Sequence, residues 1–373
     1  MIDRQAPGRV RDSIVSYLSE RDEPVGLGDI EKAVRRKVGK VSPSSIRSYI
    51  NLNTPEMFER TSRGHYQLRE QESAWKGPEL SKSIEPNFIF ENAKLFQSDC
   101  IEYLTRQEPH CFNAIVTDPP YGLVEYTPKE QAKLRKGRGG VWRIPPSFDG
   151  HVRSPLPRFT VLDEKDRQAL HDFFVKVAIQ MMRVTAPGAN VVIASNPLLM
   201  HVVTNAMTFA GFEPRGSIVR LVMTMRGGDR PKNAHLEYPD ISVMPRSAWE
   251  PWLIFRHPLI GRVQDNLKQW KTGGFRRPSK ERPFCDLIKS SPTSARERRL
   301  APHPSLKPQK FLRELVRAVL PMGEGTILDP FAGSGSTLAA ANAVGYSSVG
   351  IELDEHYVQL ARRAIPSLSK FTP

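Results

Sequence analysis

The stretch 113–122 constrains the fold of this chain more than any other. An apolar, β-prone run, NAIVT, leads directly into the tetrad Asp118-Pro119-Pro120-Tyr121. Such a run predicts a buried strand of a parallel sheet, and the functional groups of open α/β sheets lie beyond the carboxyl ends of such strands. Two successive prolines end the strand and restrict the backbone that follows. The tetrad therefore offers a carboxylate, carbonyl acceptors and an aromatic face, a set that suits an amino group on a planar ring.

A second motif far downstream favours this functional interpretation over a plain proline turn. The predicted strand 325–329 runs into a glycine-rich turn with Gly333 and Gly335, and Glu352 ends the next predicted strand, an order typical of a nucleoside site. A phosphate-binding P-loop needs a lysine that this turn lacks, and a dinucleotide fingerprint needs a small residue where Leu338 stands. S-adenosylmethionine fits best, because its amino-acid end can lie over the two glycines while Glu352 takes both ribose hydroxyls.

Hydrophobic patterns divide the chain into a small domain and an α/β core with an insertion. With 373 residues the chain has room for two or three domains. Helical spacing of apolar residues, a helix start at Ser42-Pro43 and a short hairpin predict an N-terminal α+β domain. Alternating strand and helix patterns predict an α/β fold with helices on both faces of a sheet. The predicted boundaries are 1–70 for the N-terminal domain, 71–92 for a linker, 93–223 for the first part of the core with the tetrad, 224–300 for a basic insertion, and 301–373 for the cofactor-binding part of the core.

The composition narrows the class of partner. The formal net charge of +14 and the isoelectric point near 9.8 favour a polyanion, although charge alone leaves a membrane surface and RNA open. No apolar run is long enough to span a membrane and no signal-peptide pattern is present, so we expect a cytoplasmic protein. The three cysteines, Cys100, Cys111 and Cys285, lack metal-like spacing, so we expect neither disulfides nor a metal site.

The predicted insertion 224–300 holds much of the excess positive charge. Tryptophans such as Trp252 and Trp270 alternate there with cations, as on nucleic-acid surfaces. Packing of the tryptophans in a small subdomain is the alternative, but it does not explain the arginines. A long, basic loop after the tetrad is typical of a lid or binding loop. The cations predicted to contact DNA in these two segments are Lys136, Arg138, Lys271, Arg276 and Arg277.

The motif order resembles the β class of the amino-methyltransferases of DNA, which modify adenine N6 or cytosine N4 at specific sites. The resemblance rests on the tetrad, on the downstream segment 329–335 (DPFAGSG) and on the basic insertion between them. The segment 303–308 (HPSLKP) looks like that family's His-Pro-Thr-Gln-Lys-Pro element, from which Ser305 and Leu306 depart. The resemblance covers roughly residues 93–365 and implies a Rossmann-like, S-adenosylmethionine-dependent methyltransferase sheet.

The N-terminal domain resembles a winged helix, more particularly the HARE-type helix-turn-helix module. In that case the third helix, with Arg47, would enter a major groove. A wing that binds another protein is the alternative.

The resemblance to the amino-methyltransferases also implies roles for the residues of the motifs. Asp118 and the Pro119 carbonyl would accept the two N–H bonds of an exocyclic amino group, Pro120 would hold the loop, and Tyr121 would stack on the flipped base. The implied cofactor residues are Asp99 for the adenine ring, Lys307 for the carboxylate, Gly333 and Gly335 for the methionine and Glu352 for the ribose, with Ser305, Asp329 and Phe331 beside them.

The sequence therefore predicts a site-specific DNA methyltransferase that uses S-adenosylmethionine. Asp at the first tetrad position favours adenine N6 over cytosine N4. The alternatives are cytosine N4 methylation, methylation of RNA or of a protein glutamine amide, and a non-catalytic winged-helix regulator with a vestigial methyltransferase domain. Expected partners are double-stranded DNA, a cognate restriction endonuclease and a second copy of the chain in a homodimer.

Overall fold

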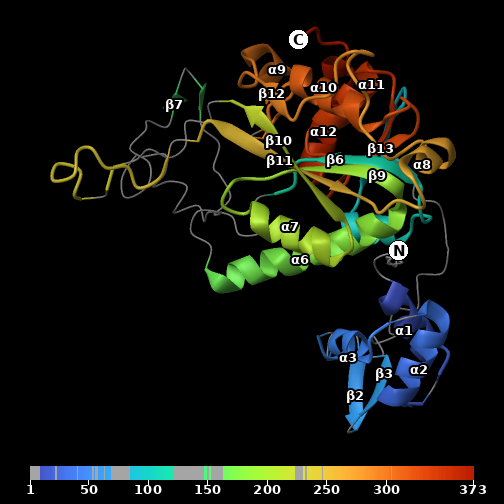
Figure 1. Ribbon diagram of the computed structural model, residues 1–373. Coiled ribbons are helices and arrows are strands. Elements are labelled where there is room, and N and C mark those ends of the chain that lie inside the picture. Colours follow the sequence, from blue (N-terminus) through green and yellow to red (C-terminus); the bar gives the residue numbers. More distant parts are fainter. Residues whose placement is uncertain are drawn as a thin grey trace. The chain divides into compact units, whose positions relative to one another are not determined.

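The chain forms two compact units, Met1–Lys82 and Ser83–Pro373 (Figure 1). The computed structural model describes residues 9–21, 23–39, 41–52, 54, 58–62, 64–68, 85–120, 147–148, 151–152, 163–222, 230–231, 233–245, 247–303 and 305–373. Each unit has hydrophobic clusters of its own. Within the described ranges, no helix is long and apolar enough to cross a membrane.

The N-terminal unit combines three helices with a three-stranded sheet. Its elements are α1 (Arg9–Ser19), β1 (Val25–Gly26), α2 (Leu27–Val38), α3 (Pro43–Leu52), β2 (Phe58–Ser62) and β3 (His65–Leu68), and the strand order is β1-β3-β2. On α2, Ile30, Val34 and Val38 recur at helical spacing and are buried in one core with Phe58 of β2. The predicted helices and hairpin are therefore present, whereas a winged-helix function of this unit stays a prediction.

The second unit is built on a nine-stranded mixed sheet. Its strand order is β12-β10-β11-β9-β6-β13-β14-β5-β4. The strands are β4 (Phe88–Phe90), β5 (Ala93–Gln97), β6 (Phe112–Thr117), β9 (Thr185–Ala194), β10 (Glu213–Leu221), β11 (Trp249–Arg256), β12 (Leu287–Lys289), β13 (Thr326–Asp329) and β14 (Ser347–Glu352). The five strands from β9 to β5 in that order are parallel, while β11 and β4 flank them in antiparallel orientation. A separate two-stranded sheet joins β7 (Ser147–Phe148) to β8 (His151–Val152).

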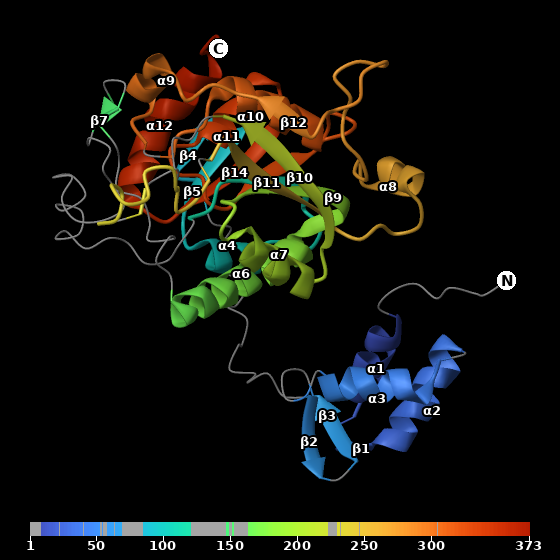
Figure 2. The same cartoon turned by 60° about the vertical axis from the view of Figure 1, so that its left-hand side comes forward.

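Helices cover both faces of the nine-stranded sheet (Figure 2). One face packs against α4 (Cys100–Thr105), α6 (Glu164–Val184) and α7 (Met200–Phe209), and the other against α10 (Gln309–Val319), α11 (Ser336–Ala343) and α12 (Glu355–Ser369). On β6, Ile115 joins the first cluster while Ala114 and Val116 join the second, as the two-residue period of a strand requires. Two short helices, α8 (Val263–Gln269) and α9 (Ala295–Leu300), complete the described helices of this unit. The predicted α/β core is thereby confirmed.

The structure divides two of the predicted segments differently. Phe88–Phe90, placed in the predicted linker, is the edge strand β4. Within the predicted insertion 224–300, residues Trp249–Arg256 form β11, an internal strand between β9 and β10. Trp252 of this strand is fully buried and its ring packs against Phe311 at 5.2 Å. Trp252 is thus a core residue and not part of a nucleic-acid surface.

Candidate active site

Three neighbouring parallel strands end at the same edge of the sheet, and an acid stands at each end. Asp118 directly follows β6, Asp329 ends β13 and Glu352 ends β14. The hydroxyl of Thr117 donates to Asp329 Oδ1 at 2.6 Å, which ties the ends of β6 and β13 together. Of the tetrad, Tyr121 lies outside the described residues. This carboxyl edge is where open α/β sheets bind their ligands.

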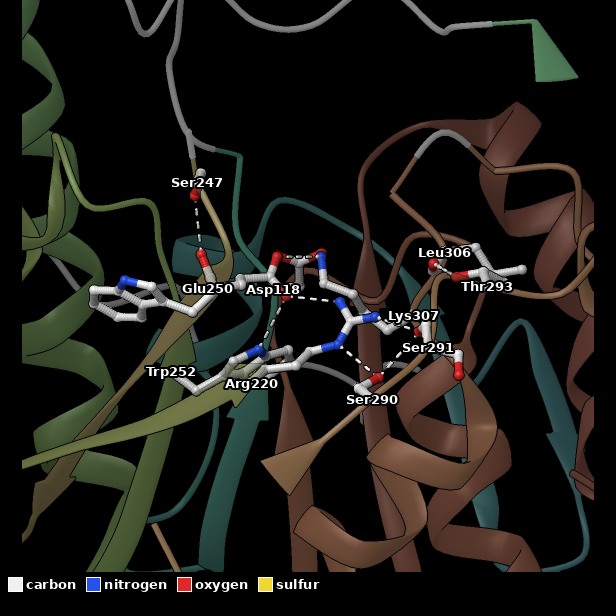
Figure 3. Close-up of polar contacts among 11 residues, drawn as sticks. Asp118, Arg220, Ser247, Glu250, Trp252, Ser290, Ser291, Thr293, Leu306 and Lys307 are labelled. Atoms are coloured by element: carbon white, nitrogen blue, oxygen red, sulfur yellow. Dashed lines mark hydrogen bonds and ion pairs between the residues drawn. The ribbon is translucent and has the colours of Figure 1, made fainter. Parts of the chain in front are cut away.

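Asp118 belongs to a network of four charged side chains (Figure 3). Lys307 Nζ donates to Asp118 Oδ2 and lies 3.3 Å from Glu250 Oε1. Glu250 Oε2 in turn accepts a hydrogen bond from Arg220 Nη1 at 2.8 Å. All four side chains are at most 17% exposed. Because buried charges are costly unless they are paired, this alternation of two cations with two carboxylates stabilises every member.

Arg220 fixes the far end of the network. Its Nε donates to Ser290 Oγ at 3.0 Å and its Nη2 to the Ser291 carbonyl at 3.2 Å. Trp252 Nε1 adds a donor to Glu250 Oε2 at 3.3 Å. Arg220 and Glu250 are direct partners in the antiparallel β10–β11 pair, so the backbone register holds them together.

Neither Arg220 nor Glu250 was predicted from the sequence as a site residue. The signal in the sequence is a single charged residue within each of two largely apolar runs, Arg220 in 217–222 and Glu250 in 249–255. Their pairing becomes visible only when the strand register is known.

Asp329 is the most deeply buried acid at this edge, with 3% exposure. Burial raises the pKa of Asp329 to about 6, although hydrogen bonds from Thr117, Thr337 and the Phe331 amide oppose the rise. The negative charge of Asp118 adds to it. These contacts make Asp329 a link between β6, β13 and the following turn, and the cofactor contact predicted for it stays a prediction.

The turn between β13 and α11 depends on two glycines in the left-handed region. The φ angle is +52° at Gly333 and +75° at Gly335. A Cβ on Gly333 would lie 3.1 Å from His303 Nε2, and one on Gly335 would lie 2.5 Å from Ile365 Cγ1. Backbone conformation and close packing therefore both exclude a side chain at Gly335.

Glu352 connects the end of β14 to this turn. Its Oε2 accepts the Gly333 amide at 2.7 Å and its Oε1 accepts the Asp354 amide at 2.9 Å. Burial raises the pKa of Glu352 above its ordinary value. A carboxylate has about four lone-pair sites, so Glu352 can hold the turn and still accept ligand hydroxyls.

His303 packs against the other side of the glycine turn. Its Nδ1 accepts the Ser305 amide at 3.1 Å, and its ring meets Tyr357 edge to face at 4.6 Å. Burial, with a further contribution from the charge of Lys307, lowers the pKa of His303 to about 4. The ring is therefore neutral at pH 7, and its proton is on Nε2, the atom nearest Gly333.

Two more of the predicted cofactor residues lie at this edge. Asp99 caps α4, where its Oδ1 accepts the Ile101 and Glu102 amides at 2.8 and 3.0 Å. The amide of the preceding residue, Ser98, donates to the Glu352 carbonyl at 3.1 Å, which places Asp99 beside Glu352. Phe331 packs its ring against Phe173, with centroids 6.0 Å apart.

Three of the cations predicted to contact DNA lie away from this edge, namely Lys271, Arg276 and Arg277. Asn113, near the start of β6, donates to the Trp270 carbonyl at 3.0 Å, so Lys271 follows at the opposite, amino edge. Arg276 donates to the hydroxyl of Tyr346, which directly precedes β14, and the Arg277 carbonyl accepts from Arg317 at 3.0 Å. A six-residue strand spans about 20 Å, so this placement gives no support to a shared DNA surface with Asp118. Lys136 and Arg138 lie outside the described residues.

Comparison with known proteins identifies the family. Residues 112–363, more than half of the chain, match the DNA methylase family N6_N4_Mtase. The chain belongs to this family.

Individual proteins share at most about a third of their aligned residues with this DNA methylase in the comparisons that follow. The chain is 23% identical over 276 residues to the Type II methyltransferase M2.DpnII of Streptococcus pneumoniae, and the match covers 73% of this chain and 88% of that one. Over 70 residues it is 36% identical to the DNA adenine methyltransferase YhdJ of Escherichia coli (strain K12), covering 19% and 24%. The structure of a DNA modification methylase from Thermus thermophilus, complexed with S-adenosyl-L-methionine, matches with a TM-score of 0.48 and 21% identity, covering 74% of this chain and 95% of that one.

DNA methylases of this family are S-adenosylmethionine-dependent amino-methyltransferases, and the donor set of this chain fits that cofactor. Acidic acceptors stand just after β5, in Asp99, and at the end of β14, in Glu352. The turn between β13 and α11 has no lysine, as expected for a cofactor without phosphate. Among the described residues, no cluster of His, Cys, Asp or Glu could hold a metal ion.

Proposed function

We propose that this DNA methylase transfers the methyl group of S-adenosylmethionine to N6 of an adenine flipped out of double-stranded DNA. The observation that carries the proposal is the adjacency of β6 and β13 in the sheet. The carboxylate that follows β6, Asp118, and the glycine turn that follows β13 thereby lie side by side at one edge. An acceptor for an amino group and a turn for a methyl donor are thus neighbours.

The main chemical task of the chain is to make the amino nitrogen nucleophilic. Its lone pair is delocalised into the ring, and bound S-adenosylmethionine supplies an electrophilic sulfonium methyl. Asp118 and the Pro119 carbonyl accept the two N–H bonds, which draws the nitrogen toward tetrahedral geometry and localises the lone pair. As positive charge develops on the nitrogen, the Asp118 carboxylate stabilises it.

Tyr121 and the prolines serve the flipped base. Removing a base from the duplex costs a few kcal/mol, and stacking on an aromatic ring returns about 1–3 kcal/mol. Pro119 and Pro120 restrict the backbone so that the carbonyl acceptor stays in place without a loss of conformational entropy on binding.

The cofactor residues act by binding and orientation. Glu352 takes the ribose hydroxyls and Asp99 faces the adenine ring, while Gly333 and Gly335 let the methionine part approach the backbone. Phe331 and Ser305 border the same turn, and Asp329 keeps the ends of β6 and β13 together. The predicted contact of Lys307 with the cofactor carboxylate competes with two protein carboxylates, because Lys307 pairs with Asp118 and Glu250.

Two observations support adenine over cytosine. Asp stands first in the tetrad, and a relative that is 36% identical over 70 residues is named a DNA adenine methyltransferase. Cytosine N4 offers the same kind of amino group to Asp118. Methylation of cytosine N4 is therefore the alternative, and analysis of the methylated nucleosides distinguishes it from methylation of adenine N6.

The N-terminal unit is proposed as a second DNA contact, in the manner of a winged helix. On α3, Arg47 has a side chain that is 58% exposed, although its Nε lies 2.6 Å from Glu31 Oε1. This ion pair offsets part of the charge that Arg47 offers to a phosphate. We therefore expect the unit to add modestly to DNA affinity. A cognate restriction endonuclease and homodimer formation stay predictions.

The test of the proposed function is the variant Asp118→Ala. We expect it to lose methyl transfer to DNA by at least about a thousandfold, because it removes the charged acceptor, and to bind S-adenosylmethionine as the wild type does. Incorporation of labelled methyl groups and calorimetric titration of the cofactor measure the two properties. Asp172→Ala, which removes an exposed acid of α6, is the matched control. Normal incorporation by Asp118→Ala with intact cofactor binding would contradict the proposal.

A further inference from the structure

The pairing of Lys307 with Asp118 creates a requirement that the proposed reaction must meet. For Asp118 to offer its full negative charge to the amino group of a base, the Lys307 ammonium has to move off Asp118 Oδ2. An ammonium that remained there would also repel the positive charge that develops on the amino nitrogen. Yet the Lys307 side chain is only 9% exposed, so it cannot turn to water without a large change. A buried ammonium without a partner is strongly unfavourable, so a second carboxylate has to stand within reach.

Glu250 is that second carboxylate. Its Oε1 lies 3.3 Å from Lys307 Nζ (Figure 3). Its Oε2 is held by Arg220 and Trp252, so that Oε1 keeps its direction. The serines that bind Arg220 extend this support into the segment after β12. Glu250 is therefore fixed independently of Lys307.

We propose that Glu250 is a positioning residue that takes over Lys307 when Asp118 accepts the amino group of the base. This inference rests on the proposed methyl transfer. When Lys307 moves from Asp118 to Glu250, its ammonium stays paired with a carboxylate throughout. Asp118 becomes available as an acceptor, and the number of charges in the network stays the same. Arg220 holds Glu250 in place, so it acts through Glu250.

A merely structural role of the Arg220–Glu250 pair is the competing interpretation. The same two strands contain a second cross-strand pair of the same chemistry, Arg256–Glu213, where Arg256 Nε and Glu213 Oε2 are 3.0 Å apart. This pair stands at the amino edge of the sheet, far along the strands from Asp118. Glu213→Gln is therefore a matched control for Glu250→Gln, because it breaks an Arg–Glu pair of the same ladder away from the site.

The experiment measures single-turnover methyl transfer at saturating DNA and S-adenosylmethionine, together with cofactor affinity and Tm. We expect Glu250→Gln to slow methyl transfer by at least about tenfold, since Lys307 then stays on Asp118, while cofactor affinity changes by less than about threefold. Glu213→Gln should transfer methyl groups at the wild-type rate. If Glu250→Gln alone does not fold, the pair of substitutions Arg220→Met and Glu250→Gln removes both charges and should show the same slowing.

A double-mutant cycle with Lys307→Met decides whether Glu250 acts through Lys307. Once the ammonium is gone, Glu250→Gln should have no further effect on the rate. Equal slowing by Glu250→Gln with Lys or Met at position 307, or a wild-type rate in Glu250→Gln itself, would overturn the inference. Failure of the proposed function is distinguishable from failure of this inference about Glu250, because in that case the wild type itself would transfer no methyl group to DNA.

Discussion

At the scale of single residues, the acids at the carboxyl edge differ in what surrounds them. Asp118 pairs with an ammonium, whereas Asp329 is surrounded by hydroxyl and amide donors in a fully buried position. Glu352 accepts two backbone amides. The sequence predicted each of these acids as a site residue, because each stands at or just after the end of a predicted strand. It could not predict which of them is ionised, because that depends on burial and partners.

Asp329 makes stability depend on pH in a predictable direction. Its pKa in the folded protein, about 6, is higher than the ordinary value of 3.8, so folding favours the protonated acid. This contribution to stability is present below about pH 4 and is lost as the pH rises through about 6. In the variant Asp329→Asn, the side-chain amide at position 329 does not ionise in this pH range. The free energy of unfolding of Asp329→Asn relative to the wild type should therefore rise by up to about 3 kcal/mol between pH 4 and pH 6.5.

Urea unfolding at the two pH values measures this difference. Because both proteins contain the same other titrating groups, their effects cancel in the comparison. A relative stability that is constant or falls with pH would show that Asp329 is ionised in the folded protein at pH 4.

At the scale of elements, the sequence predicted the parallel strands well and the antiparallel ones poorly. Strands β6, β13 and β14 are short apolar runs bounded by proline, glycine or acids, and helices follow closely after β13 and β14. By contrast, β11 contains Pro251 and begins with Trp249 and Glu250, a composition that indicated a nucleic-acid surface. Tertiary packing overrides that local signal, because the strand lies between β9 and β10 in the sheet.

The glycine turn offers a prediction at this scale. Gly335→Ala places a Cβ 2.5 Å from Ile365 Cγ1 at a φ of +75°, so it strains the turn and displaces α12. We expect a loss of about 2–4 kcal/mol in the free energy of unfolding and weaker binding of S-adenosylmethionine. Chemical unfolding and calorimetry measure the two effects.

Gly274→Ala is the control for this change. A Cβ on Gly274 would meet nothing within 4 Å, and its backbone is outside the left-handed region. Equal stability of the Gly335→Ala and Gly274→Ala variants would contradict the packing described for the turn.

At the scale of the whole molecule, each unit has a core of its own. All strands of the nine-stranded sheet and all described residues of the candidate active site belong to residues 83–373. A protein of residues 83–373 should therefore fold and bind S-adenosylmethionine with the affinity of the full chain. We expect its DNA affinity to fall several-fold and the salt dependence of binding to become shallower, because the exposed cations of the N-terminal unit are lost.

Calorimetry and DNA binding at several salt concentrations test this division of tasks. Loss of cofactor binding in residues 83–373 would show that the N-terminal unit is needed for the cofactor site. An unchanged salt dependence would show that this unit does not contact the phosphates.

The net charge of +14 was informative about the partner but not about where the partner binds. The sequence predicted cations near the bound DNA, yet Lys271, Arg276 and Arg277 lie at the edge opposite to Asp118. The position of these three cations depends on the path of the chain between β11 and β12, and no local sequence pattern determines that path.

The identity of the methylated nucleoside tests the proposed reaction most directly. Duplex DNA is incubated with the wild-type chain and S-adenosylmethionine that has an isotopically labelled methyl group, then digested and analysed by mass spectrometry. We expect labelled N6-methyladenine with the wild type and none with Asp118→Ala. Labelled N4-methylcytosine would contradict the preference for adenine, and label in 5-methylcytosine, or in no nucleoside, would contradict amino-group methylation at Asp118.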